Sequence, residues 1–165
     1  MNLMSEAHTG IRTRLETGIA YRKYRYWDKF VFIHINKTGG SSIEAALDIP
    51  FEHKTALEKI QDWGERAWQQ KLSFTVVRNP WDKVVSHFFY RVDTNQTQLK
   101  QRYMGFNDWV VRAYGEKDEQ YYDKPKMFMP QLDWISDREG RLLVDEIVRF
   151  EQLEAGFNQV AEKIG

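Results

Sequence analysis

The sequence predicts an α/β fold in which a central, mainly parallel β-sheet is flanked by helices on both faces. Two runs, FVFIHI over residues 30–35 and LSFTVV over residues 72–77, are almost wholly apolar and rich in β-prone residues. Such runs are typical of strands that are buried on both faces. A segment with helical patterning follows each run, and this alternation favours a parallel sheet.

Length and composition limit the classes of protein to consider. The 165 residues are 42% apolar and 29% charged, which suits one domain with a hydrophobic core. The 24 basic and 24 acidic residues balance, so an anion site must be local, and binding to nucleic acid through overall charge is not expected. The sequence has no cysteine, which excludes disulfides and thiolate chemistry.

Targeting signals are not evident in the sequence. No apolar run approaches the ~18 residues of a membrane helix. The N-terminus lacks the basic and then apolar layout of a signal peptide. We therefore expect a cytoplasmic protein without a membrane partner.

The polar residues 1–28 are expected to form an irregular lead-in segment before a domain over residues 29–165. Within that segment, YRKYRYW over residues 21–27 interleaves cations with aromatic rings. This composition also suits a nucleic-acid-binding arm. We favour a segment that packs on the domain.

The first predicted strand is followed by the loop HINKTGGSS, residues 34–42, and then by a helix over residues 41–49. Ser41 or Ser42 is expected to cap this helix. Its predicted inner face consists of Ile43, Ala46 and Leu47. Further helices are predicted from about residue 54 through ALEKIQDW and over residues 63–70.

The second predicted strand leads directly into a helix, RNPWDKVVSHFFYRV. Asn79 is expected to cap it, with Pro80 at its first position and Asp82 in its first turn. The apolar residues at helical spacing predict a core stripe of Trp81, Val84, Val85, Phe88 and Val92.

The C-terminal third predicts one more β-element between helices. Residues 106–114 are expected to be helical, and residues 115–127 to form a charged surface loop. QLDWI and LLVDEIVRF flank the turn at residues 137–140 and predict a hairpin or two short strands. EQLEAGFNQVAEKI predicts a closing amphipathic helix.

The loop after the first strand has the composition of an anion site. Backbone N–H groups around Thr38, Gly39 and Gly40 can form a concavity that binds an anion, and glycine permits the backbone angles needed. The following helix adds its positive end, and Lys37 adds a full charge. We expect a tetrahedral anion here, at the carboxyl end of a buried strand.

The second strand ends in another potential anion ligand, Arg78. Many nucleotide hydrolases place a magnesium-binding acid at such a position, and they also satisfy GxxxxGK[ST], which this loop does not. Ser86 lies two helical turns further on and can donate a hydroxyl beside Arg78. Two anion sites without an obvious metal site fit a nucleotide that carries phosphates at both ends of its ribose.

Two segments, FIHINKTGGSSIE and FTVVRNPWDKVVSHFFYR, resemble the donor-binding motifs of sulfotransferases that use 3′-phosphoadenosine-5′-phosphosulfate, in particular the carbohydrate-type branch. RFEQLE resembles a strand-to-helix junction found late in that family, so the resemblance covers roughly residues 28–165. It implies a P-loop-like three-layer sandwich. The family usually continues beyond this helix, and we expect the chain to lack that C-terminal portion.

The resemblance also implies roles for individual residues. The 5′-phosphosulfate would be held by Lys37, Thr38, Gly39, Gly40, Ser41 and Ser42. The 3′-phosphate would be held by Arg78 and Ser86. Asn36 stands where loops of this family often have proline.

Sulfuryl transfer, by analogy with phosphoryl transfer, requires positioning and neutralisation of developing charge. Lys37 is expected beside the bridging oxygen. The acceptor hydroxyl needs a base, which suits histidine, and family members commonly place a catalytic histidine in the region of His53. Glu44 or Glu52 would be the alternative base. Other roles are expected for the remaining histidines, His8, His34 and His87.

Two other functions stay open. A kinase or hydrolase of the P-loop type would depend on magnesium, and a non-catalytic relative would bind adenosine 3′,5′-bisphosphate without transferring anything. The resemblance implies a carbohydrate acceptor, while a small alcohol or phenol also fits. The sequence does not predict the oligomeric state.

Overall fold

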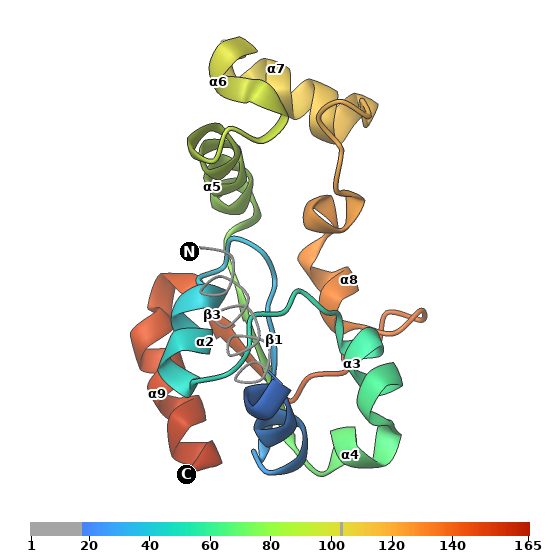
Figure 1. The fold of residues 1–165 in the computed structure, drawn as a ribbon, viewed down its shortest axis with the longest axis vertical. Helices are drawn as coiled ribbons and strands as arrows, with labels where there is room; N and C mark the ends of the chain where they lie inside the picture. The colour runs from blue at the N-terminus through green and yellow to red at the C-terminus, as the bar shows by residue number, and fades with distance from the viewer. Residues whose placement is uncertain (1–17, 103) are drawn as a thin grey trace, which may run out of the picture.

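The computed structural model describes residues 18–102 and 104–165 (Figure 1). Within these residues, β1 (Phe30–Ile33), β2 (Leu72–Val77) and β3 (Glu146–Arg149) form a sheet in the order β1-β2-β3. Both neighbouring pairs are parallel, and the register aligns Ile33 with Thr75 and Val77 with Arg149. All three strands therefore end toward the same edge. The predicted α/β class with a parallel sheet is confirmed.

Helices lie on both sides of the sheet (Figure 1). One side carries α2 (Gly40–Leu47) and α9 (Leu153–Ile164). The other side carries α3 (Ala56–Trp63), α4 (Glu65–Gln69) and α8 (Gln131–Ile135). The apolar core between them includes all four residues of β1 and the side chains of Phe74 and Val76 from β2. The prediction that these strands are buried on both faces is confirmed.

A second apolar cluster lies beyond the carboxyl edge of the sheet. Figure 1 shows α5 (Pro80–Asp93), α6 (Leu99–Arg102) and α7 (Phe106–Val110) extending away from the strands. Between α5 and α6 lies η1 (Gln96–Gln98), and α7 continues as the π-helical η2 (Val111–Glu116). The turn η3 (Pro125–Phe128) precedes α8, and η4 (Phe150–Gln152) joins β3 to α9. The cluster consists of Phe88, Leu99, Trp109, Ala113, Tyr121 and Phe128.

The segment over residues 18–26 is helical, where the sequence predicted irregular structure. Tyr24 is buried in the core around the sheet. Its hydroxyl accepts a hydrogen bond from the N–H of Phe32 at 2.7 Å and donates to the carbonyl oxygen of Phe32 at 3.2 Å. This part of the lead-in segment thus packs on the sheet, while residues 1–17 lie outside the described residues.

Several helix boundaries follow the capping signals in the sequence. Thr55 caps α3 in a capping box with Glu58. Asn79 caps α5 by accepting the N–H of Trp81 at 3.0 Å, and Pro80 is the first helical residue. The predicted helices at α4, α7 and α9 are also present.

The predicted cap of α2 is wrong. The helix begins at Gly40, and Gly39 is the N-cap, with φ 86° and no side-chain cap. Ser41 and Ser42 therefore lie in the first turn. The left-handed backbone of Gly39 starts the helix earlier than a serine cap would. Of the predicted inner face, Ile43 is buried and Leu47 is half-buried, whereas Ala46 is exposed and Glu44 is buried instead.

The predicted core stripe of α5 is confirmed for Phe88, Val84 and Val92 and is wrong for Trp81 and Val85. Trp81 is 80% exposed and Val85 is 38% exposed. The buried residues of this helix are Lys83, His87, Phe88 and Arg91. Because α5 extends beyond the sheet, α7 and the segment over residues 111–128 determine which of its faces is buried.

The predicted hairpin is reduced to a single antiparallel bridge between Ser136 and Leu142. QLDWI is the helix α8, and its Trp134 and Ile135 are buried in the core. A short apolar run can form either element, and here packing against the core selects the helix. The following run supplies β3, which pairs with β2 instead of with a hairpin partner.

Among residues 18–102 and 104–165, no helix has both the length and the apolar character that a membrane crossing requires.

Candidate functional site

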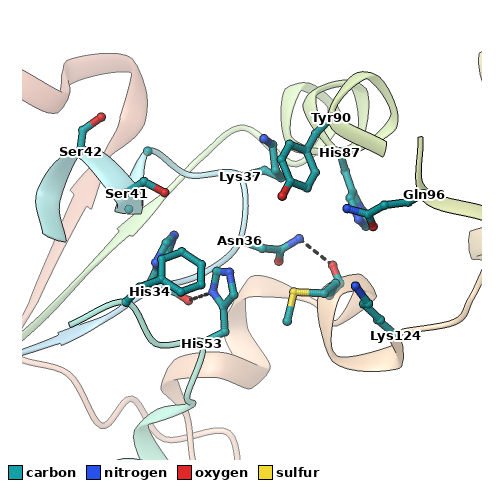
Figure 2. A pocket seen from close by; sticks show the side chains of 14 residues that line it. His34, Asn36, Lys37, Ser41, Ser42, His53, His87, Tyr90, Gln96 and Lys124 are labelled. Atoms are coloured by element: carbon teal, nitrogen blue, oxygen red, sulfur yellow. Dashed lines mark hydrogen bonds between the residues drawn. The ribbon is translucent and has the colours of Figure 1, made fainter. Parts of the chain in front are cut away.

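A cavity of about 390 Å³ opens at the carboxyl end of β1, between α2 and α5 (Figure 2). Six of the residues predicted for the site line it together: Lys37, Gly39, Gly40, Ser41, Ser42 and His53. The wall is completed by His34, Asn36, Phe51, His87, Tyr90, Gln96, Lys124 and Met127. Two segments separated in the sequence, the loop after β1 and the segment before α3, therefore face the same space.

The backbone of the loop after β1 has two residues in the left-handed region, Lys37 with φ 65° and Gly39 with φ 86°. The side chain of Thr38 lies between them and is fully buried, and its hydroxyl donates to the carbonyl oxygen of Ile35 at 2.8 Å. Thr38 does not line the cavity, so the structure does not bring this predicted ligand of the anion to it. Successive N–H groups here precede the positive end of α2, an arrangement that attracts anions.

The two glycines of this loop are required by close packing. A Cβ on Gly40 would lie 2.0 Å from Cδ2 of His34, which is far inside contact distance. A Cβ on Gly39 would lie 3.0 Å from the ring of Phe150, and the positive φ adds strain for any other residue. Both positions therefore need glycine for the backbone to adopt this curve.

Lys37 is restrained through its side chain and through its backbone. Its Nζ lies 4.0 Å from the centre of the Tyr90 ring, a cation–π contact, and its carbonyl oxygen accepts from Nη1 of Arg78 at 3.4 Å. Burial lowers the pKa of the Lys37 ammonium below its ordinary value, and the nearby Arg78 charge lowers it further. Tyr90, on α5, thus holds the ammonium at the wall of the cavity when no ligand is bound.

His53 is oriented as a general base would be. Its Nδ1 lies 3.0 Å from the carbonyl oxygen of His34, and a carbonyl can only accept, so Nδ1 carries the proton. Nε2 then holds the free lone pair, and Figure 2 shows that side of the ring facing the cavity. Burial lowers the pKa of His53 below its ordinary value, against the opposing effect of the hydrogen bond to His34. The neutral form is therefore favoured at neutral pH.

The two alternative bases are turned away from the cavity. Glu44 is buried, with Oε1 2.9 Å from Nδ1 of His34, although this contact does not have hydrogen-bond geometry. Oε1 of Glu44 also accepts from the N–H of Glu52 at 3.1 Å. Glu52 itself is paired with Lys59 and with Lys54. Neither carboxylate lines the cavity.

His87 also lines the cavity, but its surroundings differ from those of His53. Its Nδ1 lies 3.2 Å from the hydroxyl of Tyr114. Burial lowers the pKa of His87 to about 3, helped by the charges of Arg91 and Lys83. It therefore stays neutral over the physiological range.

Arg78 lines a second cavity, of about 510 Å³, at the carboxyl ends of β2 and β3. Its backbone is held by Gln131, whose Oε1 accepts the Arg78 N–H at 2.9 Å and whose Nε2 donates to the Arg78 carbonyl oxygen at 2.7 Å. Its guanidinium lies 4.3 Å from the centre of the Phe150 ring. Since the same ring packs beside Gly39, the two cavities lie next to each other.

The structure does not bring Ser86 to either cavity. Ser86 is half-buried on α5, and it is absent from the described linings of both the β1 and the β2 cavities. Its predicted contact with the anion at Arg78 has no support in this geometry.

Among the lining side chains that sequence reasoning did not single out are Tyr90 and Arg149. Tyr90 lies one helical turn after Ser86 on α5, while Lys37 lies in the loop after β1. Residue spacing within one helix could therefore not predict their contact. Arg149 does carry a signal, since it ends a strand just as Arg78 does. The hairpin prediction for this region hid that signal.

In the described part of the chain, no three side chains among the histidines, aspartates and glutamates are grouped so that they could hold a metal ion. Comparison with protein-family models, with curated proteins and with solved structures finds no match to this chain. The resemblance to sulfotransferases therefore rests on the motifs themselves.

Proposed function

We propose that this protein is a sulfotransferase that moves a sulfuryl group from 3′-phosphoadenosine-5′-phosphosulfate to the hydroxyl of an acceptor, which is a carbohydrate by the motif resemblance. One observation carries the proposal. The anion-binding backbone after β1 and the free nitrogen of His53 face one cavity, and Arg78 contacts the same loop from the neighbouring cavity.

In this proposal the donor occupies both cavities. Lys37, the backbone of Gly39 and Gly40, and the first turn of α2 with Ser41 and Ser42 hold the 5′-phosphosulfate, and a role for Thr38 is supported only by the motif. Arg78 holds the 3′-phosphate, because a guanidinium is a strong partner for a phosphate. A role for Ser86 is supported only by the motif.

The chemical step follows from these positions. The acceptor hydroxyl gives its proton to Nε2 of His53 while its oxygen forms a bond to sulfur. The bond between sulfur and the bridging oxygen of the 5′-phosphate breaks, and adenosine 3′,5′-bisphosphate leaves with the electron pair. The ammonium of Lys37 neutralises the charge that grows on that oxygen.

The proposal includes a P-loop-like three-layer sandwich as the finer description of the fold. It is supported by the parallel strand order and by helices on both sides of the sheet (Figure 1). A cytoplasmic location, and the lack of nucleic-acid and membrane partners, stay predictions from the sequence.

Calorimetric titration tests the proposal. The protein is titrated with adenosine 3′,5′-bisphosphate in the presence of EDTA and, separately, with ATP and magnesium. We expect the bisphosphate to bind without metal and Arg78→Ala to weaken it by about tenfold or more, the loss of a charge-assisted contact. Preference for ATP with magnesium would favour a kinase or hydrolase and contradict the proposal.

A further inference from the structure

The cavity at the carboxyl ends of β2 and β3 contains a second arginine besides Arg78. Val77 and Arg149 are register partners across the two parallel strands, so Arg78 and Arg149 leave the sheet at the same edge. Both side chains line the same 510 Å³ cavity. The pair comes from segments that are 71 residues apart in the sequence, and the strand register brings them together.

The surroundings leave both guanidinium groups available for an anion. Arg149 is exposed and forms no ion pair with the carboxylates of residues 18–102 and 104–165. Nε of Arg78 is buried and has no hydrogen-bond partner among those residues. An unpaired buried donor is costly, and a phosphate oxygen in the cavity would satisfy it.

One carboxylate, that of Glu151, shares the cavity with the two arginines. Its Oε1 accepts the N–H of Asn79 at 2.7 Å. This hydrogen bond is the main cause of its lowered pKa, and the charges of Arg78 and Arg149 both contribute. All three charged side chains line the same cavity, and its two arginines and one glutamate leave it with a net positive charge.

We propose that Arg149 is a specificity-determining residue that binds the ribose 3′-phosphate of the donor together with Arg78. This inference rests on the proposed function and deepens it. Arg149 takes the place that the motif gives to Ser86, which does not reach this cavity. Two guanidinium groups at the ends of neighbouring strands can hold the three terminal oxygens of the phosphate with paired hydrogen bonds.

The test compares two nucleotides that differ only in the 3′-phosphate, adenosine 3′,5′-bisphosphate and adenosine 5′-monophosphate. Calorimetry gives the ratio of their affinities for the wild type, Arg149→Ala, Arg149→Lys and Arg78→Ala. Arg138→Ala is the matched control, since Arg138 is exposed in the turn at residues 137–140. Thermal denaturation confirms that each variant is folded.

We expect Arg149→Ala to lower the affinity for the bisphosphate about tenfold and to change the affinity for the monophosphate by no more than about twofold. Arg149→Lys should recover part of the loss, because it keeps the charge without the paired donors. Arg138→Ala should match the wild type. Glu151→Gln keeps a side-chain oxygen that can accept the hydrogen bond from the N–H of Asn79. It should raise the affinity for the bisphosphate because it removes a negative charge from the cavity.

Failures of the two proposals differ. If Arg78→Ala lowers the ratio of bisphosphate affinity to monophosphate affinity and Arg149→Ala leaves this ratio unchanged, the role of Arg149 is overturned while the proposed function stands. If the wild type binds the two nucleotides equally, no 3′-phosphate site exists and the inference is overturned. If it binds neither, the proposed function itself is contradicted, and this inference with it.

Discussion

The loops after β1 and β2 both end parallel strands at the same edge of the sheet, yet they are built in different ways. The loop after β1 relies on backbone: left-handed Lys37 and Gly39, a glycine packed on His34, and the start of α2. The site after β2 relies on side chains: Arg78 follows β2, while Arg149 and Glu151 come from the end of β3 and the turn after it. A backbone site tolerates few substitutions because the fold depends on it, whereas a side-chain site can change its ligand while the fold remains.

This difference assigns different tasks to the two cavities. The first holds the candidate base, His53, and the ammonium of Lys37, so we assign the chemistry to it. The second holds charged groups at the far end of the proposed nucleotide, so we assign donor selection to it. Substitutions in the two cavities should therefore change different kinetic parameters.

The largest effect is expected for Lys37. Lys37→Ala should lower the rate of donor turnover by about 10²- to 10³-fold, since the charge on the leaving oxygen loses its partner. Donor affinity should fall much less. Arg78→Ala should show the opposite pattern, with weaker donor binding and a nearly unchanged maximal rate. The measurement is release of adenosine 3′,5′-bisphosphate from the donor, with the best acceptor from a panel of methyl glycosides.

Equal losses of donor affinity in both variants, with turnover unchanged at saturation, would contradict the assignment of Lys37 to the leaving group. The comparison between the two cavities would then lose its chemical basis.

The backbone nature of the first loop predicts an effect on stability. Gly40→Ala would place a Cβ 2.0 Å from Cδ2 of the buried His34. We expect a loss of about 3 kcal/mol in the free energy of unfolding, the upper range for overpacking in a core. Urea denaturation measures it. Gly115→Ala is the control, because nothing lies within 4 Å of a Cβ at that position.

A normal unfolding midpoint for Gly40→Ala would show that the contact between α2 and His34 is not tight, and the backbone description of this loop would be wrong.

A substitution of His53 should slow the chemical step without changing the binding of the donor nucleotide in the first cavity. His53→Gln should lower turnover by about 10²-fold, as expected for the loss of a general base. Its affinity for adenosine 3′,5′-bisphosphate should match the wild type. The base must be neutral to act, and burial lowers its pKa, so wild-type turnover should be constant near neutral pH and fall with acidification at a pH below about 6.5.

The pH profile of turnover checks this expectation. If turnover of His53→Gln still falls with acidification as it does in the wild type, another group is the base. A limb centred above pH 6.5 would contradict the effect of burial on His53.

The smallest effect is expected for Tyr90, whose ring holds the Lys37 ammonium at 4.0 Å. Binding of the donor must break this contact, which is worth about 0.5–1 kcal/mol at a partly exposed site. Tyr90→Leu should therefore raise the affinity for adenosine 3′,5′-bisphosphate by about two- to fivefold. Tyr90→Phe keeps a ring and should resemble the wild type. The neighbouring exposed Phe89 provides the control Phe89→Leu.

Calorimetry measures all four proteins. Weaker binding by Tyr90→Leu would mean that the ring places Lys37 for the donor instead of holding it away.

The sequence predicted the parts of the molecule that local chemistry determines. FVFIHI and LSFTVV supply the buried strands, and the helix predicted from about residue 54 begins after Thr55. Asn79 caps α5 because its side chain reaches the nearest free N–H group. The glycines after β1 predicted a loop whose backbone angles favour glycine, and one of them, Gly39, has a positive φ in the structure.

The errors lie where packing between distant segments decides the outcome. QLDWI became a helix because Trp134 is buried against the core, and α5 turned Trp81 outward because it extends beyond the sheet. The pairing of β3 with β2 brings Arg149 beside Arg78, and no local pattern contains that information. The side-chain site was therefore harder to predict than the backbone site.

The central claim is that one donor nucleotide spans both cavities, and a crystal structure of the protein with adenosine 3′,5′-bisphosphate tests it most directly. The account predicts the 5′-phosphate over the N–H groups of residues 39–41 and the 3′-phosphate between Arg78 and Arg149. A nucleotide bound in the reverse orientation, or outside these two cavities, would contradict it.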